Sequence, residues 1–300
     1  MNYINLSELA DNYSQDLGAN LKSVIIKEML HLDILKALSD CEISKQIAFQ
    51  GGTALRLCYQ GTRYSENLYF VLCDESLDFD KELFKEFEEV FIKSIKNKYN
   101  LETELIYPKN EENKVQKWVA KINLPIENRK ERINIEVCKI PSYDNKIKNI
   151  INRYNHNHNE DIFLKVESLD EILADKIIAF GAREYIKYRD LWDIKFLKDR
   201  NIVLNSEFVK NKINDYKIFD FDKLLDEKLY ILNNEDLKEN FLQEMSRFLE
   251  PKLLNKIIEF NYFSDIKEAI NQLCDEFKNN QNHKKINKKR SINESSRCRS

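Results

Sequence analysis

The sequence has 300 residues, of which 42% are hydrophobic and 33% are charged, and its formal net charge is −3. This much apolar content can bury one large core or two modest ones, so it excludes an intrinsically disordered chain. Residues 278–300 carry eight of the 48 Lys and Arg residues but one of the 51 acids. We therefore expect an acidic folded body and a basic disordered tail over residues 278–300.

Cysteine spacing and hydropathy indicate the cellular compartment of the protein and the kinds of site it can contain. The six cysteines are scattered without a C-x-x-C pair, so neither a zinc site nor a disulfide framework is indicated. The sequence opens without a signal-peptide pattern, and no stretch approaches the roughly 20 apolar residues of a membrane span. We expect a cytoplasmic protein that does not contact the membrane.

The first half of the chain alternates predicted helices and strands. Apolar residues at helical spacing predict helices, and alternating or short apolar runs that end at Gly or Pro predict strands. The glycine turn Gly51-Gly52 separates a strand from the helix that follows it. The expected helices are 21–38, 53–59 and 79–99, and the expected strands are 46–50, 67–73, 101–108, 115–125 and 131–141.

The second half reads as helical. A polar, asparagine-rich segment ends the first domain, which we place at residues 1–160. Ser168 and Glu171 form a capping box at the start of a helix over residues 172–186. Further helices are expected at 188–199 and around 236–249 and 252–260. These patterns predict the α+β class, with a mixed sheet and flanking helices followed by a C-terminal helical bundle over residues 161–277.

The glycine turn is the first candidate site. Main-chain N–H groups at a helix N-terminus attract anions, and glycine lets a phosphate approach closely. Thr53 would add a hydroxyl donor. A short G-G-T turn is also compatible with a simple reversal of the chain.

Charged side chains on the two helices after Ser168 form a second candidate group. Lys176 lies on the apolar face of its helix, where a buried ammonium needs an anion, either a carboxylate or a bound phosphate, unless its stem extends to water. Asp190 and Asp193 border the apolar face of the next helix. They could orient Lys176, Arg183 or Arg189, act as bases, or form a structural ion pair.

Glu136 lies in the centre of the strand "INIEVCKI". Its side chain points to the face opposite Ile135 and Val137 because strand side chains alternate. A metal ligand and a solvent-facing carboxylate both fit this position.

Two separated motifs resemble one family. The stretch "FQGGTALRLCYQGTRYSENLYF" and the later "LADKIIAFGAREYIKYRDLWDIKFL" resemble the two signatures of AbiEii/AbiGii-type nucleotidyltransferase toxins. The resemblance implies a polymerase-beta-like nucleotidyltransferase core, a cognate antitoxin as partner, and transfer of NMP from an NTP to tRNA or another RNA with Mg²⁺. It covers about residues 21–197.

The resemblance also implies roles for individual residues. Gly51, Gly52 and Thr53 would hold the triphosphate, with Arg63 and Ser65 at matching positions ahead of the next strand. Glu136 would be the third carboxylate of the metal site. Lys176 would reach the phosphates and Asp190 would take the acidic place of the last motif.

This sequence departs from the family at the metal site. The two Asp of the family pattern S-E-D-L-D-F fall on Asn67 and Tyr69. An amide offers no charge and a phenol is neutral at pH 7, so Mg²⁺ binding should be severely weakened. Two hypotheses follow: a nucleotidyltransferase with impaired activity, or a catalytically inactive member that binds nucleotide, RNA or antitoxin.

Overall fold

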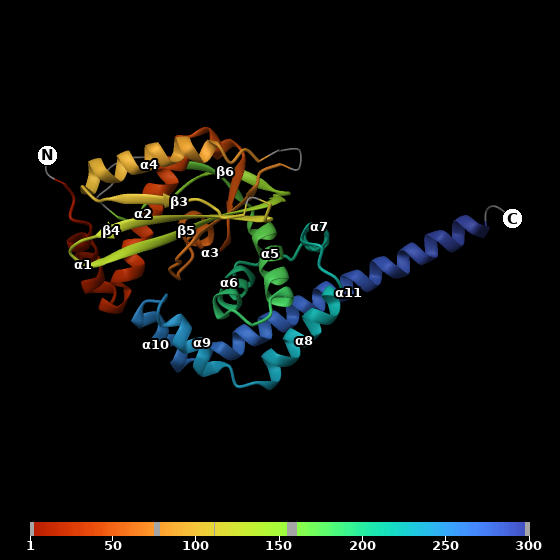
Figure 1. Cartoon of the computed structure of the whole chain (residues 1–300). Helices are drawn as coiled ribbons and strands as arrows, with labels where there is room; N and C mark the ends of the chain where they lie inside the picture. Colours follow the sequence, from red (N-terminus) through yellow and green to blue (C-terminus); the bar gives the residue numbers. More distant parts are fainter. Residues whose placement is uncertain (1–2, 75–78, 111, 155–160, 298–300) are drawn as a thin grey trace. The chain divides into compact units, whose positions relative to one another are not determined.

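The computed structural model describes residues 3–74, 79–110, 112–154 and 161–297, with side chains described as far as Asn279 (Figure 1). The chain divides into two compact units. The first comprises Met1–Ser168 and Glu239–Glu259, and the second Leu169–Lys238 and Phe260–Ser300. The predicted boundary at residue 160 lies close to this division, but residues 239–259, which we expected in the helical domain, group with the first unit.

The described residues of the first unit form a seven-stranded mixed sheet in the order β3-β4-β5-β2-β1-β7-β6. Strand β2 pairs antiparallel with β1 and parallel with β5, and β1 pairs parallel with β7. The strands are β1 (Ile47–Gln50), β2 (Leu68–Leu72), β3 (Thr103–Ile106), β4 (Val115–Leu124), β5 (Arg129–Pro141), β6 (Asn145–Asn149) and β7 (Phe163–Glu167). The predicted α+β class is confirmed.

Helices cover the sheet because the strands alternate between an apolar and a more polar face. In β2, Leu68 and Phe70 are buried and Tyr69 between them is partly exposed. Helix α4 lies above the sheet in Figure 1 and stacks Phe84 on Trp118 of β4, with ring centroids 3.7 Å apart. The helices of this unit are α1 (Leu6–Leu17), α2 (Lys22–Ser39), α3 (Gly51–Cys58), α4 (Leu83–Tyr99), α9 (Lys238–Met245) and α10 (Pro251–Glu259), with 3₁₀ turns at Ala19–Leu21 and Glu42–Lys45.

The predicted elements of the first half are largely present, with three differences. Helix α4 begins at Leu83, not at residue 79. Helix α1 was not predicted, because its sequence is mostly polar. Strand β6 falls almost wholly in the polar, asparagine-rich segment near which we placed the domain boundary, and β7 begins where that segment ends. No strand was predicted for either, and β7 pairs in parallel with β1, which no local pattern reveals.

The second unit is helical in its described part. Helix α5 contacts α6, α7 and α8, and α11 contacts α6 and α8. The helices are α5 (Leu169–Ala182), α6 (Tyr188–Asp199), α7 (Ser206–Tyr216), α8 (Phe221–Asn234) and α11 (Tyr262–Arg297). Residues 278–297, which we expected to belong to a disordered tail, are described as the continuation of α11. No helix in the described part of the chain has both the length and the apolar composition of a membrane span.

One buried histidine makes the stability of the first unit depend on pH. His31 of α2 is fully buried, and its Nε2 lies 3.1 Å from the backbone oxygen of Glu66, to which the neutral ring can donate. Burial lowers the pKa of His31 from 6.5 to about 4. Between these values the unfolded chain binds more protons than the folded chain, so stability falls as the pH falls from 6.5 towards 4.

We expect the wild-type protein to lose about 2 to 3 kcal/mol more unfolding free energy between pH 7 and pH 4.5 than the His31→Gln variant loses. Glutamine keeps an N–H donor for the Glu66 carbonyl but has no group that titrates. Urea unfolding of both proteins at the two pH values measures the difference. Parallel losses in the two proteins would contradict this assignment to His31.

Candidate functional site

The glycine turn connects β1 directly to α3. Gly51 has a φ of 77°, a left-handed conformation that glycine adopts without strain. The Gln50 side chain makes no capping hydrogen bond to α3. The side chain of the N-cap residue therefore leaves the first N–H groups of the helix unoccupied. An anion site at a helix N-terminus requires this.

Gly52 is required by a different contact. A Cβ atom at this position would lie 1.9 Å from Nη2 of Arg63, so a larger residue would displace the guanidinium. Arg63 is 5% exposed, and its Nη1 donates to the backbone oxygen of Tyr64 at 2.9 Å. The structure therefore places a buried positive charge against the first turn of α3. Ser65, also buried, follows in the same loop.

Two further contacts tie the turn to the start of β2. The Thr53 hydroxyl is buried and donates to the backbone oxygen of Asn67 at 2.5 Å. The Asn67 Nδ2 donates to the Tyr69 phenol oxygen at 3.1 Å. The Tyr69 ring lies 3.5 Å from the position that a Cβ of Gly51 would occupy. The two residues that replace the expected carboxylates therefore bond to each other beside the glycine turn.

Glu136 lies next to Tyr69 in the sheet. The strand register pairs Tyr69 of β2 with Glu136 of β5, and Glu136 in turn with Lys117 of β4. The Lys117 Nζ lies 3.7 Å from the Glu136 carboxylate, whose side chain is 23% exposed. Glu136 thus faces the same side as Tyr69 and has a lysine as its neighbour.

The donor set on this face does not fit two divalent ions. Such ions need several oxygen ligands, of which carboxylates contribute the charge that holds the metal. The face offers the Glu136 carboxylate, the Asn67 amide and the Tyr69 phenol. Among the described residues, no three His, Cys, Asp or Glu side chains are grouped so that they could hold a metal ion.

The second candidate group is an ion cluster in the second unit. The Lys176 Nζ lies 2.7 Å from an oxygen of Asp190 and 2.7 Å from an oxygen of Asp193. Arg183 also bonds to Asp190. Of the alternatives that the sequence left open for Lys176, pairing with carboxylates is the one observed. Its proposed role at a phosphate stays a prediction.

Two pKa values are shifted in and beside the cluster. Burial alone would raise the pKa of Asp190, but the charges of Lys176 and Arg183 lower it to about 2. Burial and the charge of Arg189 lower the pKa of Lys187 to about 8, although Asp190 opposes this shift. Sequence reasoning missed Lys187. The signal available was its place at the end of the short joint between α5 and α6, which also holds Arg183 and is followed by Arg189 in the first turn of α6.

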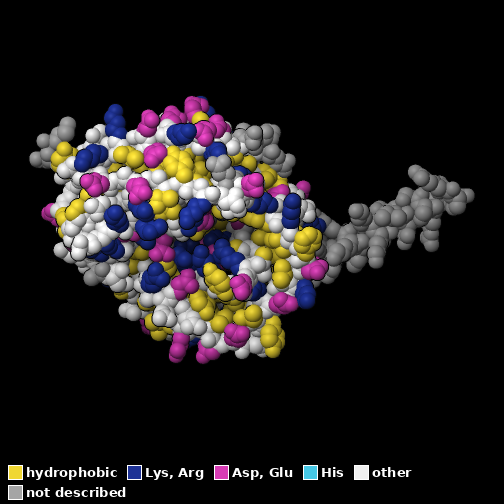
Figure 2. Space-filling model, viewed as in Figure 1, with side chains coloured by type: hydrophobic (Ala, Val, Ile, Leu, Met, Phe, Trp, Pro, Cys, Tyr) yellow, Lys and Arg dark blue, Asp and Glu magenta, His cyan; other side chains and the backbone are white. Residues whose placement is uncertain are grey.

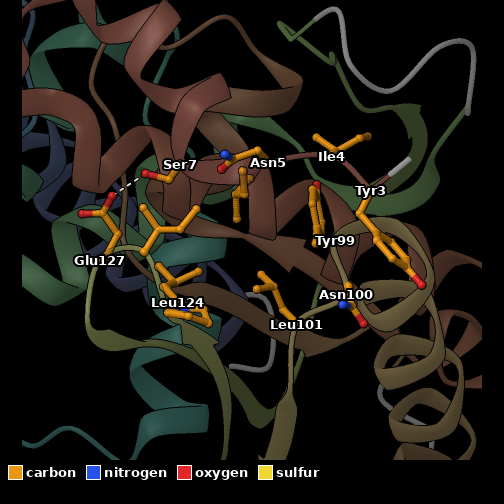
Figure 3. A pocket seen from close by; sticks show the side chains of 12 residues that line it. Tyr3, Ile4, Asn5, Ser7, Tyr99, Asn100, Leu101, Leu124 and Glu127 are labelled. Atoms are coloured by element: carbon orange, nitrogen blue, oxygen red, sulfur yellow. Dashed lines mark hydrogen bonds between the residues drawn. The ribbon is translucent and has the colours of Figure 1, made fainter. Parts of the chain in front are cut away.

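A cavity of about 240 Å³ lies elsewhere in the first unit (Figure 3). Its walls come from residues 3–7, the segment Tyr99–Leu101 at the end of α4, and the hairpin residues 124–127. The lining is largely apolar, and Ser7 bonds to Glu127 at its edge. None of the residues that the sequence identified as candidates lines this cavity.

Figure 2 shows both Lys and Arg side chains and Asp and Glu side chains on the surface. This mixture agrees with the small net charge of the chain. A wholly basic face, which would indicate binding to nucleic acid through charge alone, is not visible in this view.

Comparisons with known proteins give one family. The family profile described as "Nucleotidyl transferase AbiEii toxin, Type IV TA system" matches residues 33–266. Two similar solved structures are a putative nucleotidyltransferase from H. pylori and the protein JHP933 from Helicobacter pylori. The first is 18% identical, with a TM-score of 0.45 over 87% of this chain and 95% of its own. The second is 18% identical, with a TM-score of 0.42 over 80% and 95%. No curated protein matches.

Proposed function

This chain belongs to the AbiEii nucleotidyltransferase toxin family of type IV toxin–antitoxin systems, and from its site we propose that it binds a nucleoside triphosphate without catalysing metal-dependent transfer. The observation that carries the proposal is the hydrogen-bonded pair Asn67 and Tyr69, which stands where the family pattern has two carboxylates. Without those charges the face has little to hold Mg²⁺.

Nucleotide binding is supported by the groups around the glycine turn. The first turn of α3 presents main-chain N–H groups, and the Arg63 guanidinium lies beside Gly52. Both favour the negative charge of a phosphate. Gly51 and Gly52 leave the backbone uncovered by side chains of their own. Within this proposal Thr53 acts indirectly, because its hydroxyl hydrogen is donated to Asn67.

The partners follow from the family and belong to the same proposal. A toxin–antitoxin family implies a cognate antitoxin, and tRNA or another RNA is the acceptor expected from the resemblance. We place these partners, like the nucleotide, in the cytoplasm. A chain that binds nucleotide, RNA or antitoxin without transferring NMP would be a catalytically inactive member of the family.

The test is transfer of radiolabelled NMP from each of the four NTPs to total tRNA in the presence of Mg²⁺. We expect the wild-type protein to label RNA no more than a protein-free control. The Asn67→Asp, Tyr69→Asp double variant restores the two carboxylates and is expected to label RNA about 100-fold or more above that background. Adding Glu136→Gln to the double variant should remove the gain.

Each outcome bears on the proposal differently. Labelling by the wild-type protein at a rate comparable to the double variant would refute the loss of transfer. If neither protein labels RNA, the loss of transfer activity is supported, but residues other than Asn67 and Tyr69 must also have contributed to it. If only the double variant labels RNA, the loss of transfer activity is explained by Asn67 and Tyr69.

A further inference from the structure

A row of four side chains crosses the sheet next to the glycine turn. The register aligns Lys117 of β4 with Glu136 of β5, Glu136 with Tyr69 of β2, and Tyr69 with Gln50 of β1. Residues in register across neighbouring strands point to the same face. Asn67 shares this face, as its bond to the Tyr69 phenol requires. The row is therefore a continuous polar strip that ends at the turn.

The strip carries almost no net charge. Lys117 lies 3.7 Å from Glu136 and balances its carboxylate, while Asn67 and Tyr69 are neutral. A site built for two metal ions would place several carboxylates here. A phosphate that approached such a site without metal would be repelled, but a phosphate that approaches this strip meets the Lys117 side chain, which is 49% exposed.

Tyr69 and Lys117 of the strip can donate hydrogen bonds to a ligand, whereas the Glu136 carboxylate only accepts them. The Tyr69 oxygen accepts the bond from Asn67, so its own hydrogen can be donated elsewhere. Lys117 is a donor with no acceptor capacity. A carboxylate in place of either Asn67 or Tyr69 would accept hydrogen bonds and could contact a phosphate only through a cation. The replacements therefore change the strip from a surface that binds metal into one that can contact phosphate oxygens directly.

Resting on the proposed nucleotide binding, we propose that this site is selective for the metal-free triphosphate, and that Lys117 takes the place of the divalent cation. Magnesium bound to the nucleotide cancels part of the charge that Lys117 and Arg63 attract, and it finds few ligands in the strip. Excess Mg²⁺ should therefore weaken nucleotide binding, which is the opposite of the effect in a two-metal site.

Isothermal titration of the full chain with ATP tests the inference, first in EDTA and then in excess Mg²⁺, with NaCl added to equalise the ionic strength. We expect binding about fivefold or more tighter in EDTA. In EDTA, the Lys117→Met variant should bind ATP about tenfold more weakly than the wild-type protein, and the Lys117→Arg variant should keep the wild-type affinity. Lys121→Met is the matched control, since Lys121 lies on the same strand but pairs with Glu104 at 3.4 Å.

The outcomes separate this inference from the proposed function. Tighter binding in Mg²⁺ than in EDTA would overturn metal-free selectivity and leave nucleotide binding intact. Equal loss in the Lys117→Met and Lys121→Met variants would overturn the role of Lys117. Absence of heat in both buffers, with equilibrium dialysis also negative, would refute nucleotide binding and this inference with it. The Asn67→Asp, Tyr69→Asp variant should reverse the effect of Mg²⁺.

Discussion

Replacing Glu28 by Gln is expected to lower the unfolding free energy of the first unit by about 3 to 5 kcal/mol. Glu28 is 1% exposed and forms a two-pronged ion pair with Arg56, with N–O distances of 2.8 and 3.2 Å. It also accepts a bond from the Tyr154 hydroxyl at 2.8 Å. The variant would leave a buried guanidinium opposite a neutral amide, which costs far more than loss of a surface pair.

This pair matters for the site because Arg56 holds the loop that follows α3. Its Nη1 donates to the backbone oxygens of Gly61 and Thr62 at 3.3 and 3.2 Å, and its guanidinium lies over the Tyr64 ring. Arg63 comes from the same loop. The Glu28→Gln change should therefore weaken nucleotide binding as well as stability.

Urea unfolding followed by Trp118 fluorescence measures the effect. The chain has two tryptophans, so a Trp192→Phe background leaves Trp118 as the reporter of the first unit. Glu42→Gln is the control, because the Glu42–Lys45 pair is exposed and should change stability by less than about 0.5 kcal/mol. The Glu28→Gln, Arg56→Met double variant should recover part of the loss. A loss below about 1 kcal/mol for Glu28→Gln would contradict the assignment.

The strand, turn and helix around Gly51 could be predicted because their determinants are local. An apolar run ends at a glycine pair and helical spacing follows, and β1, the turn and α3 form as expected. The separate reasons for the two glycines could not be predicted. Gly51 needs a left-handed φ, whereas Gly52 makes room for Arg63, which approaches from a later loop. The roles of these residues in holding a triphosphate stay predictions.

Tertiary pairing accounts for most of what the sequence left open. Lys176 was recognised as a cation on an apolar face, but its partners Asp190 and Asp193 come from the next helix and depend on how α5 and α6 pack. Lys117 was not singled out, because a lysine in an alternating strand is usually a solvent-facing residue. Its place beside Glu136 depends on the register between β4 and β5.

Restoring the two carboxylates of the family pattern is expected to have the largest effect on the binding of divalent cations. Two carboxylates at positions 67 and 69, around the start of β2, would together with Glu136 give a divalent ion charged oxygen ligands on one face. The described structure has an amide and a phenol there, bonded to each other, and a lysine at the remaining carboxylate. We therefore expect the Asn67→Asp, Tyr69→Asp variant to bind divalent cations about 100-fold more tightly than the wild-type protein.

The most direct test of the account is a titration of the wild-type protein with Mn²⁺, in which electron paramagnetic resonance measures the free ion. Mn²⁺ takes the same oxygen ligands as Mg²⁺. We expect no depletion of free Mn²⁺ by the wild-type chain below about 1 mM and clear depletion by the double variant. Stoichiometric binding of Mn²⁺ by the wild-type chain at micromolar concentration, lost on Glu136→Gln, would contradict it.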